Sequence, residues 1–170
     1  MADYYKRIAY LDVLTGLGNR RAFEQQIESI RRGEAPPGGL YCVTCDINNL
    51  KWANDTLGHG QGDTLIADAA ALLQAAFGSQ GQTFRTGGDE FVAFVSQPPE
   101  AMQQALHGLR AALADYNGCH EVGLSLAVGA ARYVPEGPNS LLQVLTESDR
   151  RMYVDKKAQK AQGLTRGVSE

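Results

Sequence analysis

The sequence lacks the features that mark membrane, secreted and nucleic-acid-binding proteins. No apolar run approaches the roughly 20 residues of a membrane span, and the start, MADYYKRIAYLD, has no apolar signal-peptide core. Positive charge is not in excess, since 16 Lys and Arg stand against 19 Asp and Glu, a formal net charge of −3. We therefore expect a cytoplasmic domain that contacts neither nucleic acid nor membrane, so that any phosphate-binding site must be local.

Cysteine is also scarce, with three residues in the chain. Cys42 and Cys45 lie three apart in YCVTCD, a β-like segment where such residues point to opposite faces, so a disulfide between them would be strained. The remaining thiol, Cys119, has no second ligand pair at a zinc-like spacing. Buried structural thiols are the favoured interpretation.

The 170 residues, 44% of them hydrophobic, suit one globular domain. Apolar periodicity predicts a helix capped by Asn19, a buried strand over 40–46 and helices over 61–77, 99–116 and 140–160. Further strands are predicted on both sides of a Gly-Gly-Asp-Glu turn and over 122–133. Hairpin strands with helices between the others favour an α+β sandwich around a mostly antiparallel sheet over a doubly wound parallel one.

Three carboxylates follow strand ends. Asp46 ends the 40–46 strand, and Asp89 and Glu90 lie on the hairpin turn. If these strands are neighbours, the carboxylates converge and suit a hard ion such as Mg²⁺, which points to phosphoryl or nucleotidyl transfer. The alternative is that Asp46 caps a loop and the turn is merely solubilising.

Glycines and lysines could complete a phosphate site. Gly87 and Gly88 allow positive φ and let a large ligand lie against the turn. Lys156 and Lys160 are four residues apart on the last predicted helix, a spacing that could clamp a triphosphate. A solvated basic face is the alternative for the lysines.

An amide- and carboxylate-rich segment follows the first strand. Asn54 and Asp63 could read guanine, the amide serving O6 and N7 and the carboxylate N1 and N2. Turn formation by Asn54 and helix capping by Asp63 fit equally well. We interpret His59 as a structural hydrogen bonder and Trp52 as a core residue.

Taken together, these motifs resemble the GGDEF domains of bacterial diguanylate cyclases. The likeness runs from residue 12 to about residue 160 through DVLTGLGNRRAF, DINNLKWANDTLGHGQGD and RTGGDEF. It implies a palm-like, ferredoxin-like βαββαβ core with a five-stranded sheet, related to nucleotide cyclases and polymerases. It also implies Mg²⁺ (or Mn²⁺) and a homodimer that condenses two GTP into cyclic di-GMP and two pyrophosphates.

The resemblance assigns roles position by position. It implies that metals are held by Asp46, the Ile47 carbonyl and Asp89, with Glu90 in support, and that Asp89 is the candidate acceptor of the 3′-OH proton. The implied substrate-binding residues are Asn54 and Asp63 at guanine, His59 nearby, Leu50, Lys51, Gly87 and Gly88 along the phosphates, and Lys156 and Lys160 as the basic pair.

Some positions depart from the family pattern. Asn48, Leu50, Thr86 and Lys160 replace a common Asp, Phe, Tyr and Arg, and we expect them to tune activity. Ala127 replaces a Gly and Asp155 an Ala, changes that could disturb packing or the phosphate grip. The product-inhibition motif Arg-x-x-Asp would fall on 78–81, which reads GSQG, so we expect no feedback inhibition there.

The resemblance divides the chain into an N-terminal helix over 1–11, a candidate stub of a longer linker helix, the domain over 12–162 and a flexible tail over 163–170. A longer parent protein would carry an upstream sensor domain and could be membrane-anchored. Two functions stay open: an active diguanylate cyclase, or a catalytically weak GTP-binding module that signals through a partner.

Overall fold

Four antiparallel strands make up the sheet of the computed structural model, which describes residues 8–163. The strands are β1 (Leu40–Ile47), β2 (Gly81–Arg85), β3 (Glu90–Val95) and β4 (Leu126–Tyr133), arranged in the order β2-β3-β1-β4. β1 is central and pairs antiparallel with both β3 and β4. The end of β1 therefore lies beside the start of β3 and the start of β4.

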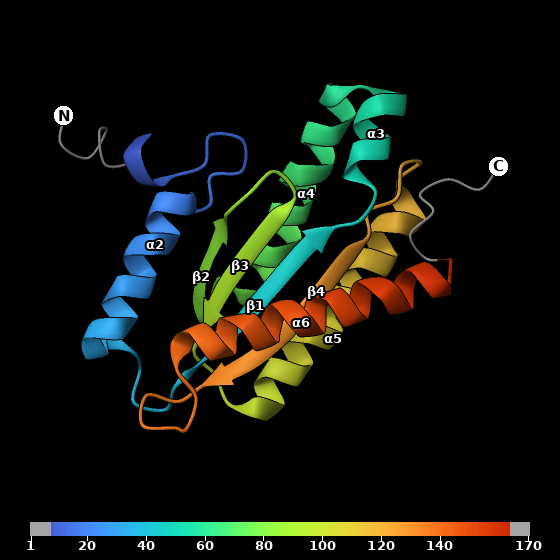
Figure 1. The fold of residues 1–170 in the computed structure, drawn as a ribbon. Coiled ribbons are helices and arrows are strands. Elements are labelled where there is room, and N and C mark those ends of the chain that lie inside the picture. The colour runs from blue at the N-terminus through green and yellow to red at the C-terminus, as the bar shows by residue number, and fades with distance from the viewer. Residues whose placement is uncertain (1–7, 164–170) are drawn as a thin grey trace.

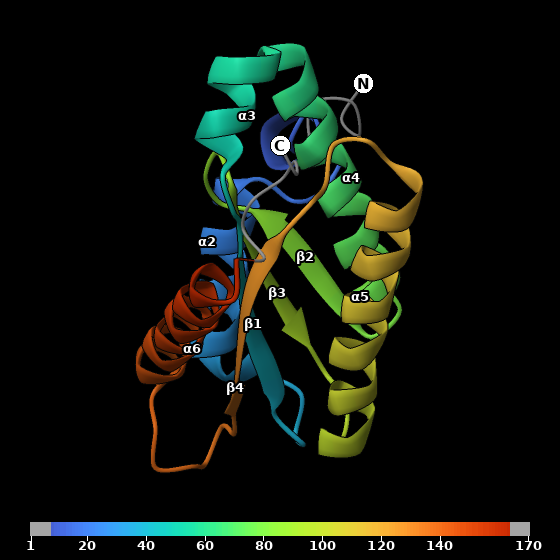
Figure 2. The ribbon, with the colours of Figure 1, turned by 90° about the vertical axis from the view of Figure 1, so that its right-hand side faces the viewer.

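Helices cover both faces of this sheet (Figures 1 and 2). The helical elements are α2 (Arg20–Ser29), the π-helical turn η1 (Ile30–Glu34), α3 (Leu50–Leu57), α4 (His59–Phe77), α5 (Pro99–Cys119) and α6 (Leu141–Ala161). In Figure 2, α2 and α6 lie on one face of the sheet and α4 and α5 on the other, while α3 stands above the strand ends. The arrangement is a three-layer sandwich.

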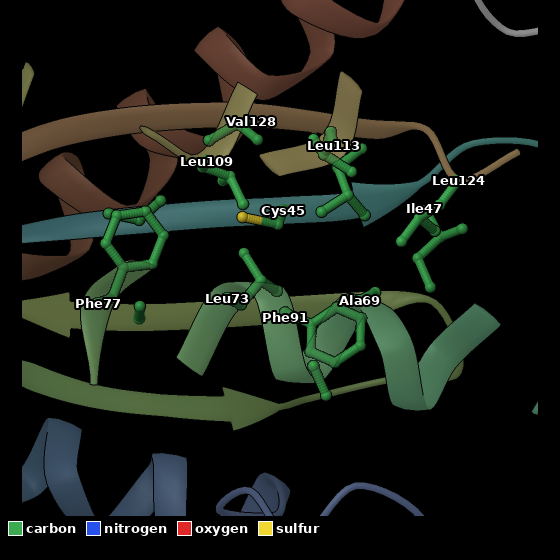
Figure 3. Packing of buried hydrophobic residues seen from close by; sticks show 14 of the residues in the cluster. Cys45, Ile47, Ala69, Leu73, Phe77, Phe91, Leu109, Leu113, Leu124 and Val128 are labelled. Atoms are coloured by element: carbon green, nitrogen blue, oxygen red, sulfur yellow. The ribbon is translucent and has the colours of Figure 1, made fainter. Parts of the chain in front are cut away.

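Side chains along each strand point alternately to the two faces of the sheet, so each face has its own hydrophobic core. Cys45 lies with Leu73, Phe91 and Leu109 in the core under α4 and α5 (Figure 3), whereas Cys42 lies in the core under α2 and α6. Both thiols are buried and free, as predicted, whereas Cys119 is exposed, so the prediction of a buried thiol is wrong there. Burial raises the pKa of Cys42 and of Cys45 to about 12, so neither is a thiolate at neutral pH.

Capping residues fix the starts of α2 and α6. Asn19 accepts the Ala22 N–H at the start of α2, as predicted. Ser140 and Gln143 form a reciprocal capping box at the start of α6. These caps set where each helix begins relative to the sheet.

The predicted α+β class and the ferredoxin-like order of elements are confirmed, but the strand count is not. The sheet has four strands within residues 8–163, where the resemblance implied five. β4 also begins at Leu126 rather than at residue 122, because the Asn117 side chain bonds both the N–H and the C=O of Leu124. Those backbone groups are therefore not used in the sheet ladder.

The terminal predictions lie mostly outside the described residues. Of the expected 1–11 helix, residues 1–7 are outside and 8–10 are helical, and of the expected tail only residue 163 is described. Within 8–163, no helix is long and apolar enough to cross a membrane.

Candidate active site

The predicted acidic residues meet where β1 ends and β3 begins. Asp46 is the cross-strand partner of Glu90, and the Ile47 N–H donates to the Asp89 carbonyl at 3.0 Å. Directly paired residues share one face of a sheet. The fold therefore brings two segments that are distant in the sequence to a single edge.

The two carboxylate oxygens of Asp46 have different surroundings. Its Oδ2 accepts a hydrogen bond from Lys156 Nζ at 2.7 Å, while its Oδ1 is buried and has no hydrogen-bond partner among residues 8–163. Burial raises the pKa of Asp46, the neighbouring Asp89 raises it further and Lys156 lowers it, leaving the pKa at about 6. One buried carboxylate oxygen is thus left for a cation, the donor that Mg²⁺ prefers.

The third carboxylate does not complete a cluster. Among residues 8–163, no group of three or more His, Cys, Asp or Glu side chains is close enough to hold a metal. Glu90 is exposed, and its Oε2 lies 2.8 Å from where a Cβ on Gly87 would stand, so it folds back over the turn. The three acidic residues therefore lie at one edge of the sheet, as expected, but among residues 8–163 their side chains do not form a metal-holding cluster, and Asp89 is the one that raises the pKa of Asp46.

The turn is supported by an ion pair to which the sequence assigned no role. Arg85 donates to the Gly88 carbonyl at 3.0 and 3.2 Å and to the carboxylate of Asp12 at 3.2 and 3.3 Å. Asp12 also accepts from the backbone and hydroxyl of Thr15. Asp12 and Arg85 lie in the DVLTG and RTGGDEF motifs, so their opposite charges were the available signal.

The two predicted guanine readers come from consecutive helices, α3 and α4. Asn54 is half-buried on α3, and its Oδ1 is so close to Gly62 that a Cβ there would lie 1.7 Å from it. Asp63 follows Gly62 in the first turns of α4 and is exposed. Because Gly62 has no side chain, α4 can approach α3 and bring these two predicted residues near each other.

The remaining predicted residues surround this edge without bonding to Asp46. Leu50 is buried and Lys51 exposed in the first turn of α3, and His59 is exposed at the start of α4. Lys160 is exposed one turn beyond Lys156 on α6. Within residues 8–163, the structure therefore brings only Lys156 of the basic pair into contact with the acidic edge.

Trp52 corrects a prediction. It is 41% exposed on α3 rather than part of the core. The helix has eight residues and buries only Leu50 and Ala53, which leaves the indole facing outward.

A cavity among the described residues lies away from this edge. It has a volume of about 830 Å³ and lies between α2, α4 and the open side of β2, with Gln26, Gln74 and Phe84 in its lining. None of the predicted site residues lines it.

The fold is an α+β sandwich with a ferredoxin-like order of elements. Comparison with known proteins assigns this fold to a family. The family model described as "Diguanylate cyclase, GGDEF domain" matches residues 9–162. The chain therefore belongs to the GGDEF family.

Two curated relatives are themselves diguanylate cyclases. The chain is 32% identical over 124 residues to diguanylate cyclase DgcS of Shewanella oneidensis, covering 72% of this chain and 42% of that protein. It is 32% identical over 165 residues to diguanylate cyclase DgcN of Escherichia coli, covering 94% and 40%. The chain thus spans about two fifths of the length of these relatives.

A solved structure supports the fold. The coiled coil and GGDEF domain of DgcB from Caulobacter crescentus, in complex with c-di-GMP, superposes with a TM-score of 0.79 at 22% identity. The match covers 92% of this chain and 85% of that one. At this identity the likeness concerns the fold alone.

Proposed function

We propose that this domain is a diguanylate cyclase that condenses two GTP molecules into cyclic di-GMP and two pyrophosphates. Family membership and the two diguanylate cyclases among its relatives support the reaction class. Because the product is a two-fold symmetric ring, each subunit of a homodimer would bind one GTP and present it to the other.

The observation that carries the proposal is the state of Asp46. Its Oδ1 is buried without a hydrogen-bond partner in the described part of the chain, Asp89 is close enough to raise its pKa, and the Lys156 ammonium already balances its Oδ2. A buried carboxylate of this kind is costly unless a cation completes it.

The donor set fits a hard divalent cation. Asp46 and Asp89, with the Ile47 carbonyl from the resemblance, would hold Mg²⁺ or Mn²⁺, and the substrate phosphates would supply further oxygens. When bound, the ion stabilises negative charge on the attacking and leaving oxygens.

The chain's own residues would then bind and orient GTP. Asn54 and Asp63 would recognise guanine, with His59 nearby, and Lys156 and Lys160 would neutralise the phosphates. The glycine turn at 87–88 and the backbone at 50–51 would let the triphosphate lie close to the chain.

For each of the two attacks, the chain has to position the nucleotides and supply one proton acceptor. The 3′-oxygen of one GTP attacks the α-phosphorus of the other; the new P–O bond forms as the α–β anhydride bond breaks and pyrophosphate leaves. The 3′-OH proton goes to a base, for which Asp89 is the candidate. A second attack in the opposite sense closes the ring.

The test is incubation with GTP and Mg²⁺ over a wide range of protein concentration, with products identified by mass. We expect cyclic di-GMP to rise faster than linearly with protein, because pairing limits the rate, and to disappear in Asp89→Asn and on chelation. Asp115→Asn, which neutralises an exposed acid on α5, is the matched control and should behave like the native chain.

The alternative function gives a different result. A GTP-binding regulatory module would bind GTP and form no product at any concentration, even when fused to a dimerising helix. That outcome would overturn the proposed cyclase activity and leave the nucleotide site in place.

A further inference from the structure

A buried polar network joins α6 to β4 and to the loop after β1. Its centre is Gln159, only 7% exposed although it lies near the end of a surface helix. Its Oε1 accepts from Asn48 Nδ2 at 2.7 Å, and its Nε2 donates to the Leu126 carbonyl and to Asp155 Oδ2, both at 2.9 Å. One side chain therefore joins α6 to two other segments, the loop after β1 and the start of β4.

The network continues to a charged end on the other side of β4. Asp155 accepts the Val128 N–H at 2.8 Å and two bonds from Arg110 on α5, each at 3.0 Å. At the opposite end, Asn48 Nδ2 also donates to Ser125 Oγ at 2.9 Å. The C-terminal part of α6 is thus held against β4, α5 and the β1–α3 loop.

The two hydrogen bonds that join Asn48 to Asp155 through Gln159 donate in the same direction, from Asn48 toward Asp155. Asn48 donates to Gln159, and Gln159 donates to the carboxylate of Asp155. If the Gln159 amide were reversed, its oxygen would face the Leu126 carbonyl and a carboxylate, two acceptors. The orientation of the amide is therefore fixed by its neighbours.

This direction connects two residues that depart from the family pattern. An ionised aspartate side chain at position 48 would have no proton to donate, so it would compete with Asp155 for the single NH₂ of Gln159. Gln159 can bond both residues at once because Asn48 donates to its oxygen and Asp155 accepts from its nitrogen. Asn48 and Asp155, two departures from the family pattern that lie far apart in the sequence, therefore belong to one hydrogen-bond network.

We propose that Gln159 is a positioning residue that fixes α6 against the β1–α3 loop and so sets the place of Lys156 at Asp46. Lys156 lies on α6 between Asp155 and Gln159, and the side chains of both residues form hydrogen bonds to the backbone of β4. Asn48, which bonds Gln159, lies two residues after Asp46. The network is therefore linked to both members of the Lys156–Asp46 ion pair. Lys156 is otherwise a flexible side chain, 40% exposed, that needs a fixed base to stay in place.

The first test needs no nucleotide. The ¹⁵Nζ signal of Lys156 should show a protected, hydrogen-bonded ammonium in the native chain, and Gln159→Met, which keeps the volume, should abolish that protection. Gln104→Met, at an exposed glutamine on α5, is the matched control and should leave it unchanged. Native-like protection in Gln159→Met would overturn the proposal.

The second test rests on the proposed function. Binding of the unreactive α,β-methylene analogue of GTP with Mg²⁺ should weaken roughly tenfold in Gln159→Met, the lower end of the loss expected when an outer hydrogen bond is removed from a phosphate or metal site. In a Lys156→Met background the same change should cost less than about twofold, because the residue acts through Lys156. Equal losses in both backgrounds would show a general structural role and overturn the proposal.

A second set of variants keeps the question answerable if Gln159→Met does not fold. Asn48→Asp alone should reduce ammonium protection, and adding Asp155→Ala should restore part of it, because the Gln159 NH₂ is then free to turn toward the new carboxylate at position 48. Purely additive effects would contradict the network. Failure of the native chain to bind the analogue would count against the proposed function and leave the ammonium measurement to decide this inference.

Discussion

The ammonium group of Lys156 donates a hydrogen bond of 2.7 Å to the carboxylate of Asp46 and so joins the last helix to the end of the central strand. The two residues are 110 positions apart, and the pair forms only when the C-terminal helix packs against the sheet. It balances one oxygen of a buried carboxylate and leaves the other without a hydrogen-bond partner within residues 8–163.

The first prediction concerns this pair. Lys156 lowers the pKa of Asp46 against the raising effects of burial and Asp89, so Lys156→Met should move the pKa above its present value of about 6. The measurement is a pH titration of the Asp46 carboxyl ¹³C signal in metal-free protein. Lys157→Met is the control, since Lys157 lies over the Tyr153 ring at 4.6 Å and no contact joins it to Asp46. An unchanged Asp46 titration would contradict the ion pair.

The second prediction is that the site residue Asp46 costs stability at neutral pH. Its pKa is raised from 3.8 to about 6, so the folded state binds the proton more tightly than the unfolded one. Its stabilising contribution is therefore fully present below about pH 4 and is lost as the pH rises through 6. Asp46→Asn should be more stable than the native chain at pH 8, by on the order of 2 kcal/mol, and equal to it near pH 4.

Thermal or urea unfolding at the two pH values measures this. Asp46→Asn should at the same time abolish product formation, since functional groups are often retained at a cost in stability. A variant less stable than the native chain at pH 8 would show that the buried carboxylate is structural.

The third prediction concerns the support of the turn. Burial works to raise the pKa of Asp12, but the hydrogen bonds from Thr15 and the charge of Arg85 outweigh it, and the pKa ends below 3.8. This contribution is present above pH 3.8 and is lost as the pH falls through the lowered pKa. Asp12→Asn should therefore cost roughly 1–3 kcal/mol of unfolding free energy at pH 7 and progressively less below about pH 4.

Glu24→Gln is the matched control for Asp12→Asn. The Glu24 pair with Arg20 is exposed on both sides, whereas Asp12 and Arg85 are only 20% and 17% exposed. The Glu24 variant should show no measurable loss in the same urea titrations. Equal effects of the two substitutions would mean that the Asp12–Arg85 pair does not hold the turn.

The sequence predicts the fold well because its local signals agree with one another. Asn19 caps α2 where its side chain and the following apolar spacing predict, and Gly-Gly-Asp-Glu turns the chain between β2 and β3. The resemblance adds the palm-like topology. It also implied a fifth strand that residues 8–163 do not contain.

The site is less predictable because side-chain direction depends on tertiary packing. Asp46 and Asp89 could be identified from strand ends, but the outward turn of Trp52 and of Glu90 could not. Gln159 gave no signal at all, since an amide near the end of a polar helix ordinarily faces solvent. Its role depends on partners at 48, 126 and 155 that only the folded chain brings together.

The last prediction tests how α3 and α4 position the nucleotide base. A Cβ on Gly62 would lie 1.7 Å from Asn54 Oδ1, so Gly62→Ala must displace the Asn54 amide. Gly60→Ala is the matched control near the start of α4, where a Cβ meets nothing within 4 Å, and alanine there favours the helix.

If Asn54 reads guanine, Gly62→Ala should weaken GTP binding about tenfold or more, as expected when a hydrogen-bonding group for a base edge is misplaced. Gly60→Ala should bind GTP like the native chain. Titration with GTP and with ATP in parallel separates the two explanations of a loss: displacement of a guanine reader reduces the preference for GTP over ATP, whereas a general loosening of the two helices lowers both affinities together. The second pattern would remove Asn54 from the base site.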